Sequence, residues 1–297
     1  MAAGDAPPVV PAVSRSARQW GMVGALAAAV GWGLAGVFVV LAATPGLVIV
    51  LYRMWLGAAL LVVVLHASGR RLTWRAIRIA APGGVLLFAD MTLFFDSLRL
   101  TSVAVATVIG ALQPLLVLAV AGPLLGERVG ARRALLGVLA VAGVGATVVG
   151  AGTPSGGGLR GDLLATGSLL AWSGYFLAAK RASRRCEPLE YTAGATLVGG
   201  IAAAVLVAAT GTVPALHAGA WVWIGLLAVV PGTAHLLMNW AHHRVDAGVS
   251  SVLVSINPIV ASAAGWVVLG QRLGVVQIVG ALVTLVAVSL VARPDDH

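Results

Sequence analysis

Charge is scarce in this chain. Only 10% of the 297 residues are Asp, Glu, Lys or Arg, whereas 60% are hydrophobic and the mean hydropathy is +1.00. A soluble domain of this length could not bury so much apolar surface, and the apolar runs reach the roughly 20 residues that a membrane-spanning helix needs. The composition therefore excludes a soluble globular fold and predicts an all-α, polytopic membrane protein.

Other features are missing as well. Cys186 is the only cysteine, so the chain has no internal disulfide framework. The sequence contains no Walker loop, no glycine-rich dinucleotide motif after a strand and no nucleophile elbow. We therefore expect no cofactor, no ATP-driven step and no enzymatic activity. The net charge of +9 could suggest a nucleic-acid partner, but the arginines stand at the ends of apolar runs, so we expect none.

The apolar runs divide the chain into ten predicted spans, with both termini on the same side of the membrane. The spans are 20–43, 46–66, 77–97, 101–125, 131–150, 162–182, 189–210, 219–241, 247–269 and 273–292. If the amino terminus is inside, fifteen of the 19 Lys and Arg residues lie in cytoplasmic segments and only Arg99, Arg160 and Arg272 lie outside. The positive-inside rule then predicts two cytoplasmic termini.

One stretch of the chain occurs twice. Residues 99–128 reappear at 243–272, so that Gln113-Pro114 aligns with Asn257-Pro258, 144 residues later. The Leu-Gly-Glu-Arg that closes the first copy aligns with Leu-Gly-Gln-Arg in the second. Five spans per half is an odd number, so the second copy would enter the membrane upside down. The pattern predicts two inverted five-helix repeats, which is typical of transporters.

These boundaries define the predicted organisation of the chain. It consists of a disordered cytoplasmic tail (1–19), a first repeat (20–150), a linker (151–161), a second repeat (162–292) and a short cytoplasmic tail (293–297).

Asp90 lies near the middle of the third predicted span. An ionised carboxylate at that depth costs roughly 2.5–3.5 kcal/mol on insertion scales, so it should face a cavity or a partner, or hold a proton. The functional interpretation is a site for a coupling proton or for a substrate amine. The alternative is a structural hydrogen bond to a neighbouring helix.

His235, Asn239 and His242 occupy one face of the eighth span, because they stand at i, i+4 and i+7. Asp90 aligns with the residue before His235, so each half places a titratable group at similar depth. Since histidine changes charge near neutral pH, an Asp90–His235 pair would suit proton coupling. Metal binding by the histidines is the rival interpretation, disfavoured because the span carries no acid or thiol ligand. His242 could instead belong to the cytoplasmic interface.

Pro114 and Pro258 should each break a helix within the membrane, where unpaired carbonyls are tolerated only beside a cavity or polar neighbours. The adjacent amides of Gln113 and Asn257 favour a substrate cavity over a kink that is satisfied within the bundle. Trp32, Trp172 and Tyr175 lie well inside their spans and could line a cavity for an apolar or aromatic substrate, whereas Trp20 fits an interfacial belt. Arg53 should snorkel to the membrane surface or pair with an acid, and Glu127 could interact favourably with the helix dipole of the fifth span.

The run from Ala106 through Pro114, followed after ten residues by Leu-Gly-Glu-Arg, resembles the EamA branch of the drug/metabolite transporter superfamily. The resemblance covers residues 20–292 and implies an inverted-repeat transporter of the bacterial inner membrane that exports amino acids, related metabolites or toxic compounds. It also implies a central cavity among the first, third, fourth, sixth, eighth and ninth helices. The residues that fall there are Trp32, Asp90, Gln113, Trp172, Tyr175, His235, Asn239 and Asn257. Gln271 departs from the family, which usually repeats the glutamate there.

The leading hypothesis is a secondary transporter, an exporter that works by alternating access and proton exchange. Its partners would be a small-molecule substrate, the lipid bilayer and protons, and a monomer and a homodimer both stay open. A membrane-embedded enzyme acting on lipid-linked substrates would need clustered acids and bases at one membrane face, whereas these loops are short and almost free of acids. A non-transporting scaffold would not need the polar residues at the midplane.

Overall fold

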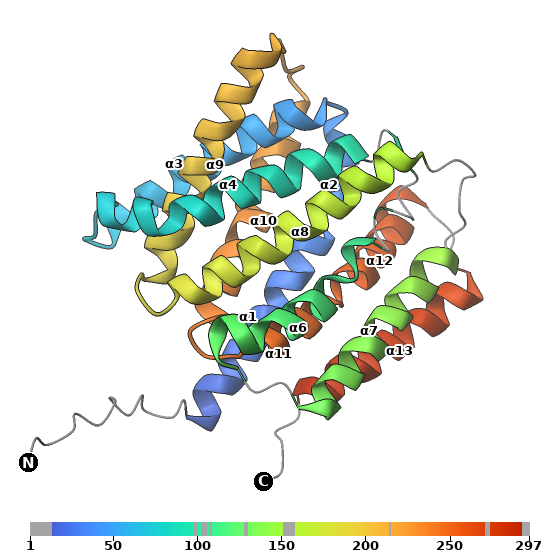
Figure 1. Cartoon of the computed structure of the whole chain (residues 1–297). Coiled ribbons are helices and arrows are strands. Elements are labelled where there is room, and N and C mark those ends of the chain that lie inside the picture. The colour runs from blue at the N-terminus through green and yellow to red at the C-terminus, as the bar shows by residue number, and fades with distance from the viewer. Residues whose placement is uncertain are drawn as a thin grey trace, which may run out of the picture.

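A computed structural model describes residues 14–97, 100–101, 106, 109–127, 130–150, 158–213, 215–270 and 274–292. Residues 1–13 and 293–297 of the predicted tails, linker residues 151–157, parts of the fourth span, and Gln271 with Arg272 lie outside this set. Residues 15–19 of the predicted amino-terminal tail and residues 159–161 of the predicted linker are helical, so these two boundaries were wrong. The described residues form twelve α-helices and no strands (Figure 1). They are α1 (Arg15–Gly33), α2 (Ala35–Ala42), α3 (Gly46–Ala67), α4 (Trp74–Ser97), α6 (Gln113–Leu125), α7 (Ala131–Gly150), α8 (Leu159–Ala182), α9 (Pro188–Thr210), α10 (Ala220–Ala241), α11 (Ala247–Val254), α12 (Asn257–Leu269) and α13 (Val275–Ala292).

Eight stretches of the described residues are long and apolar enough to cross a membrane, counting α1 with α2 and α11 with α12 as one stretch each. This finding agrees with an all-helical, polytopic membrane protein. α6 is shorter, and α8 carries Arg160 and Asp162 at its start and Lys180 and Arg181 at its end. The count of ten spans therefore stays a prediction.

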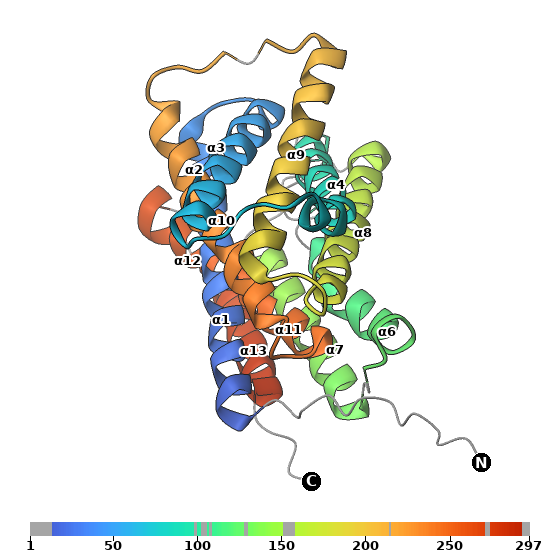
Figure 2. The same ribbon diagram turned by 90° about the vertical axis from the view of Figure 1, so that its left-hand side faces the viewer.

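Helices of the first half pair with helices of the second half (Figures 1 and 2). The most extensive contacts are α7 with α13, α4 with α8, α4 with α9, α3 with α9 and α1 with α10, and α6 packs on α11. Aligned through the displacement of 144 residues, α4 corresponds to α10 and α1 to α8, so the α4–α8 and α1–α10 contacts are equivalent. Reciprocal contacts of this kind are expected where two related halves pack against each other, although α4 contacts α9 more extensively than its counterpart α10 contacts α3.

The α7–α13 pair shows this reciprocity in its glycines. A Cβ on Gly143 would lie 2.8 Å from the Gly280 carbonyl oxygen, and one on Gly280 would lie 2.5 Å from the Gly143 carbonyl oxygen. Thr284 follows Gly280 by four residues and Thr147 follows Gly143 by four, and each threonine contacts the other helix at the opposing glycine. The two helices run antiparallel and approach closely because neither glycine carries a side chain.

The helix break predicted at Pro258 is present. α11 ends at Val254 and α12 begins at Asn257, with Pro258 in its first turn. α6 likewise begins at Gln113 with Pro114 in its first turn. The chain also breaks between α1 and α2 at Leu34, which the sequence analysis did not predict.

At one end of the bundle, α1, α7, α9 and α11 begin and α6, α8, α10 and α13 end. We call this end the amino-terminal face. Arg132, the second residue of α7, donates a 2.7 Å hydrogen bond to the carbonyl of Leu290 in the last turn of α13. Gly21 of α1 packs against Val245, just after α10. The first and last described helices therefore begin and end at the same face of the bundle.

Candidate functional site

His235 is the centre of an aromatic cluster built from three helices. Its ring centroid lies 5.0 Å from that of Trp32 on α1, 5.6 Å from Tyr175 and 6.1 Å from Trp172, both on α8. The two tryptophan rings meet edge to face at 4.9 Å. His235 itself is only 5% exposed. Four of the residues predicted from the sequence, contributed by both repeats, therefore lie together, and we call them the His235 cluster.

Asn239, one turn along α10 from His235, extends the cluster with hydrogen bonds. Its Nδ2 donates to the Tyr175 hydroxyl oxygen at 3.3 Å and to Thr192 Oγ1 of α9 at 2.9 Å. Thr192 was not singled out by the sequence analysis, because a lone threonine in an apolar helix most often bonds its own backbone. It does so here as well, to the Pro188 carbonyl at 2.7 Å.

Asp90 lies on α4 beside a second set of polar groups. Ser168 on α8 donates a 2.7 Å hydrogen bond to Asp90 Oδ1. Arg53 on α3 is 8% exposed and lies within electrostatic range of both Asp90 and His235. Of the two predictions for Arg53, burial favours pairing over snorkelling. Its proximity to both the acid and the histidine was not predictable from the sequence, because the three residues lie on different helices.

Several buried polar atoms of the residues predicted to bind substrate have no hydrogen-bond partner among the described residues. They are Trp32 Nε1, His235 Nδ1, Asn239 Oδ1 and both amide atoms of Gln113. Leaving such a group unsatisfied costs roughly 1–3 kcal/mol. Unused donors and acceptors beside aromatic walls are the composition expected of a small-molecule site.

Gln113 and Asn257 are less clearly part of this arrangement. Gln113 is buried, and Asn257 is half-buried with its backbone carbonyl oxygen facing Gly33 of α1. Among the described residues, no hydrogen bond or ring contact joins either amide to the His235 cluster. Their role in substrate binding stays a prediction.

Glu127 does not serve the helix for which the sequence analysis proposed it. Its two carboxylate oxygens accept hydrogen bonds from Ala247 N at 2.8 Å and Gly248 N at 3.2 Å, so it caps α11 in the other repeat rather than α7. Gly126 adopts a left-handed conformation with φ of +71°, which ends α6 and turns the chain at Glu127. The prediction was wrong because the nearer helix in sequence is not the nearer helix in space.

Lys180 at the end of α8 joins Glu127 to the loop after α10. Its Nζ lies 3.9 Å from Glu127 Oε1 and donates to the carbonyl oxygens of His242 at 2.7 Å and Val245 at 2.5 Å. The two charged side chains are 12% and 8% exposed. We call Glu127, Lys180 and the α11 amides the latch, because together they connect both repeats across the amino-terminal face.

His242 belongs to this end of the molecule but not to its surface. It follows α10 directly and is 1% exposed, with its ring 4.6 Å from that of Phe176. His235, Asn239 and His242 are all buried, as one polar helix face packed inward requires.

Two helical halves that pair across a shared polar and aromatic cluster are an arrangement typical of membrane transporters. The chain belongs to the EamA-like transporter family, whose sequence profile matches residues 19–149 and again residues 159–293. This family lies within the drug/metabolite transporter superfamily. A solved crystal structure has a TM-score of 0.79 to the chain at 21% identity, covering 94% of this chain and 98% of its own, and that likeness concerns the fold alone. No curated protein sequence matches the chain.

Proposed function

We propose that this protein is a proton-coupled secondary transporter of the bacterial cytoplasmic membrane that exports small amphipathic metabolites, such as apolar or aromatic amino acids and related drugs. The amino-terminal face is the cytoplasmic face, because the loops on that side carry the excess of arginine.

The observation that carries the proposal is the His235 cluster. Trp32, Trp172 and Tyr175 provide aromatic walls, and the unused atoms of His235 and Asn239 provide hydrogen-bonding capacity. The aromatic walls come from α1 in one repeat and α8 in the other, and the hydrogen-bonding groups come from α10. A site located between inverted repeats changes the face to which it is open when one repeat rocks against the other.

The charged groups beside the cluster supply the coupling. Arg53 interacts with Asp90 and with His235, so a proton that neutralises Asp90 changes the electrostatic environment of the substrate site. Because buried charges are costly within a membrane, a change in protonation alters the relative stability of the two access states.

The test is transport by the purified protein in proteoliposomes, with radiolabelled apolar and aromatic amino acids and with and without a pH gradient. We expect counterflow for at least one of these substrates and a rate that follows the gradient. Asp90→Asn should abolish the response to the gradient. Asp96→Asn is the matched control, because Asp96 lies on the same helix and is exposed. A complete lack of counterflow, or a response to pH that survives Asp90→Asn, contradicts the proposal.

A further inference from the structure

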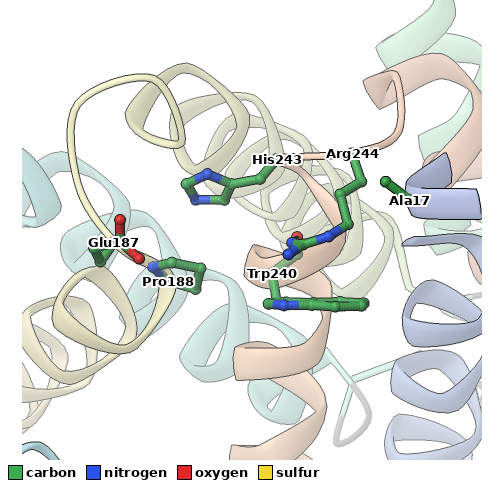
Figure 3. Close-up of a pocket in the computed structure, with 6 residues that line it drawn as sticks. All are labelled: Ala17, Glu187, Pro188, Trp240, His243 and Arg244. Carbon is green, nitrogen blue, oxygen red and sulfur yellow. Dashed lines mark hydrogen bonds between the residues drawn. The ribbon is translucent and has the colours of Figure 1, made fainter. Parts of the chain in front are cut away.

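A second site candidate lies away from the His235 cluster, at the amino-terminal face. A cavity of about 400 Å³ opens where the start of α1, the end of α10 and the start of α9 meet (Figure 3). It is lined by Ala17, Glu187, Pro188, Trp240, His243 and Arg244. The volume lies within the range of roughly 300–1,000 Å³ that small-molecule sites occupy.

Arg244 is held in place on one wall of this cavity. Its guanidinium lies over the Trp240 ring at 3.8 Å from the centroid, and Nη1 donates to the Trp240 carbonyl oxygen at 2.9 Å. Gly21 and Gly24 of α1 pack directly against Arg244 Cβ and the Trp240 indole. Among the described residues this guanidinium makes one hydrogen bond, so most of its five N–H donors remain for a ligand. Arginine held in this way is suited to a phosphate.

The facing wall also favours an anion. Pro188 begins α9, so the positive end of that helix dipole lies at the cavity. His243 is half-buried beside Arg244 and adds ring nitrogens (Figure 3). Glu187 is the one acid in the lining; its carboxylate lies 3.7 Å from Arg70 Nη1, and its side chain is largely exposed.

Exposed tryptophan places the cavity at the level of the lipid headgroups. Trp20 follows Ala17 by three residues on α1 and is 62% exposed, and Trp74 at the start of α4 is 71% exposed. Tryptophans concentrate at the boundary between the hydrocarbon and the headgroups. Basic pockets between helices at the cytoplasmic side are known to hold anionic headgroups.

We propose that this cavity binds the headgroup of an anionic phospholipid with a free hydroxyl, such as phosphatidylglycerol. Arg244 and His243 hold the phosphate, and Glu187 accepts a hydrogen bond from the glycerol hydroxyl. The assignment to the cytoplasmic leaflet rests on the orientation in the proposed function, whereas the binding itself does not.

The test is native mass spectrometry of the full-length protein in detergent, titrated with phosphatidylglycerol and, separately, with phosphatidylcholine. We expect saturable binding of phosphatidylglycerol and about fivefold weaker binding in Arg244→Gln, the change that corresponds to the roughly 1 kcal/mol that one basic residue contributes at a membrane surface. Arg181→Gln is the matched control, because Arg181 is exposed at the end of α8 and lies outside the cavity. Arg244→Lys, which keeps the charge without the fork, should fall between wild type and Arg244→Gln.

Three results would overturn the proposal. The first is unchanged phosphatidylglycerol affinity in Arg244→Gln, and the second is an equal loss in Arg181→Gln, which would indicate a diffuse charge effect. The third is displacement of the lipid by soluble glycerol phosphate at the lipid's own affinity, which would assign the site to a free anion. Thermal unfolding of each variant separates a loss of binding from a loss of fold. Because the lipid-binding experiment requires no transport, lipid binding can be observed when the transport assay fails, and transport can be observed when lipid binding is absent.

Discussion

Replacing Glu127 by glutamine should weaken the latch and open the amino-terminal face more often. The carboxylate accepts two hydrogen bonds from the first turn of α11, at 2.8 and 3.2 Å, and lies 3.9 Å from Lys180 Nζ. A glutamine keeps one acceptor oxygen but turns an NH₂ group toward the second amide. It also removes the negative charge opposite a buried lysine.

The size of the effect follows from these contacts. A hydrogen bond to a charged group contributes about 1.5–3 kcal/mol, and one such bond is lost. The attraction between Glu127 and Lys180 is largely offset by the cost of burying both charges, so it adds little to the net value. A loss of about 2 kcal/mol in the closed state changes the ratio of open to closed protein roughly 30-fold.

Cysteine accessibility measures this ratio. Ser251 on α11 is fully buried, so Ser251→Cys in a Cys186→Ala background should react slowly with a membrane-impermeant maleimide. Adding Glu127→Gln should accelerate maleimide labelling from the amino-terminal face roughly 30-fold, in proportion to the larger population of open protein. The control is Asp246→Asn, because the Arg133–Asp246 ion pair at 3.1 Å leaves the Asp246 side chain 48% exposed and should contribute at most about 1 kcal/mol. Equal labelling rates with and without Glu127→Gln would refute the reasoning.

Three further predictions concern the packing, the His235 cluster and the single thiol. Gly143→Ala should lower the melting temperature in detergent, because the new Cβ would lie 2.8 Å from the α13 backbone. Gly145→Ala is the control, and it should leave the melting temperature unchanged or raise it, because a Cβ there would have nothing within 4 Å. A larger loss in Gly145→Ala than in Gly143→Ala would contradict the α7–α13 packing. Asn239→Ala should destabilise the protein by roughly 1–3 kcal/mol, since Thr192 and Tyr175 lose their shared buried donor, and an unchanged unfolding curve would show that this bridge contributes nothing. Burial, with Glu190 nearby, raises the pKa of Cys186 to about 11, so the reactive thiolate is rare at neutral pH. The rate of alkylation should therefore rise about tenfold per pH unit at pH values below this pKa. An alkylation rate that levels off near pH 9 would contradict this.

Much of the architecture is determined by composition and local pattern. The predicted spans 189–210 and 219–241 correspond to α9 and α10 within one residue at each end. This agreement arises because span length is fixed by bilayer thickness, and the ends are marked by arginine, glycine and proline, all of which are local properties. The helix break at Pro258 was predictable for the same reason, since proline removes a hydrogen bond wherever it stands.

The sequence also indicated which residues on α10 face inward, because a spacing of three and four residues places His235, Asn239 and His242 on one side of a helix. Only the tertiary structure decided what they meet. Arg53 lies within electrostatic range of Asp90 and His235, Thr192 accepts a hydrogen bond from Asn239, and Glu127 caps a helix 120 residues away. These contacts depend on which helices are neighbours and how each is rotated about its axis. Both are set by the packing of small residues such as Gly21 and Gly143 against partners in the other repeat, and no local pattern encodes them.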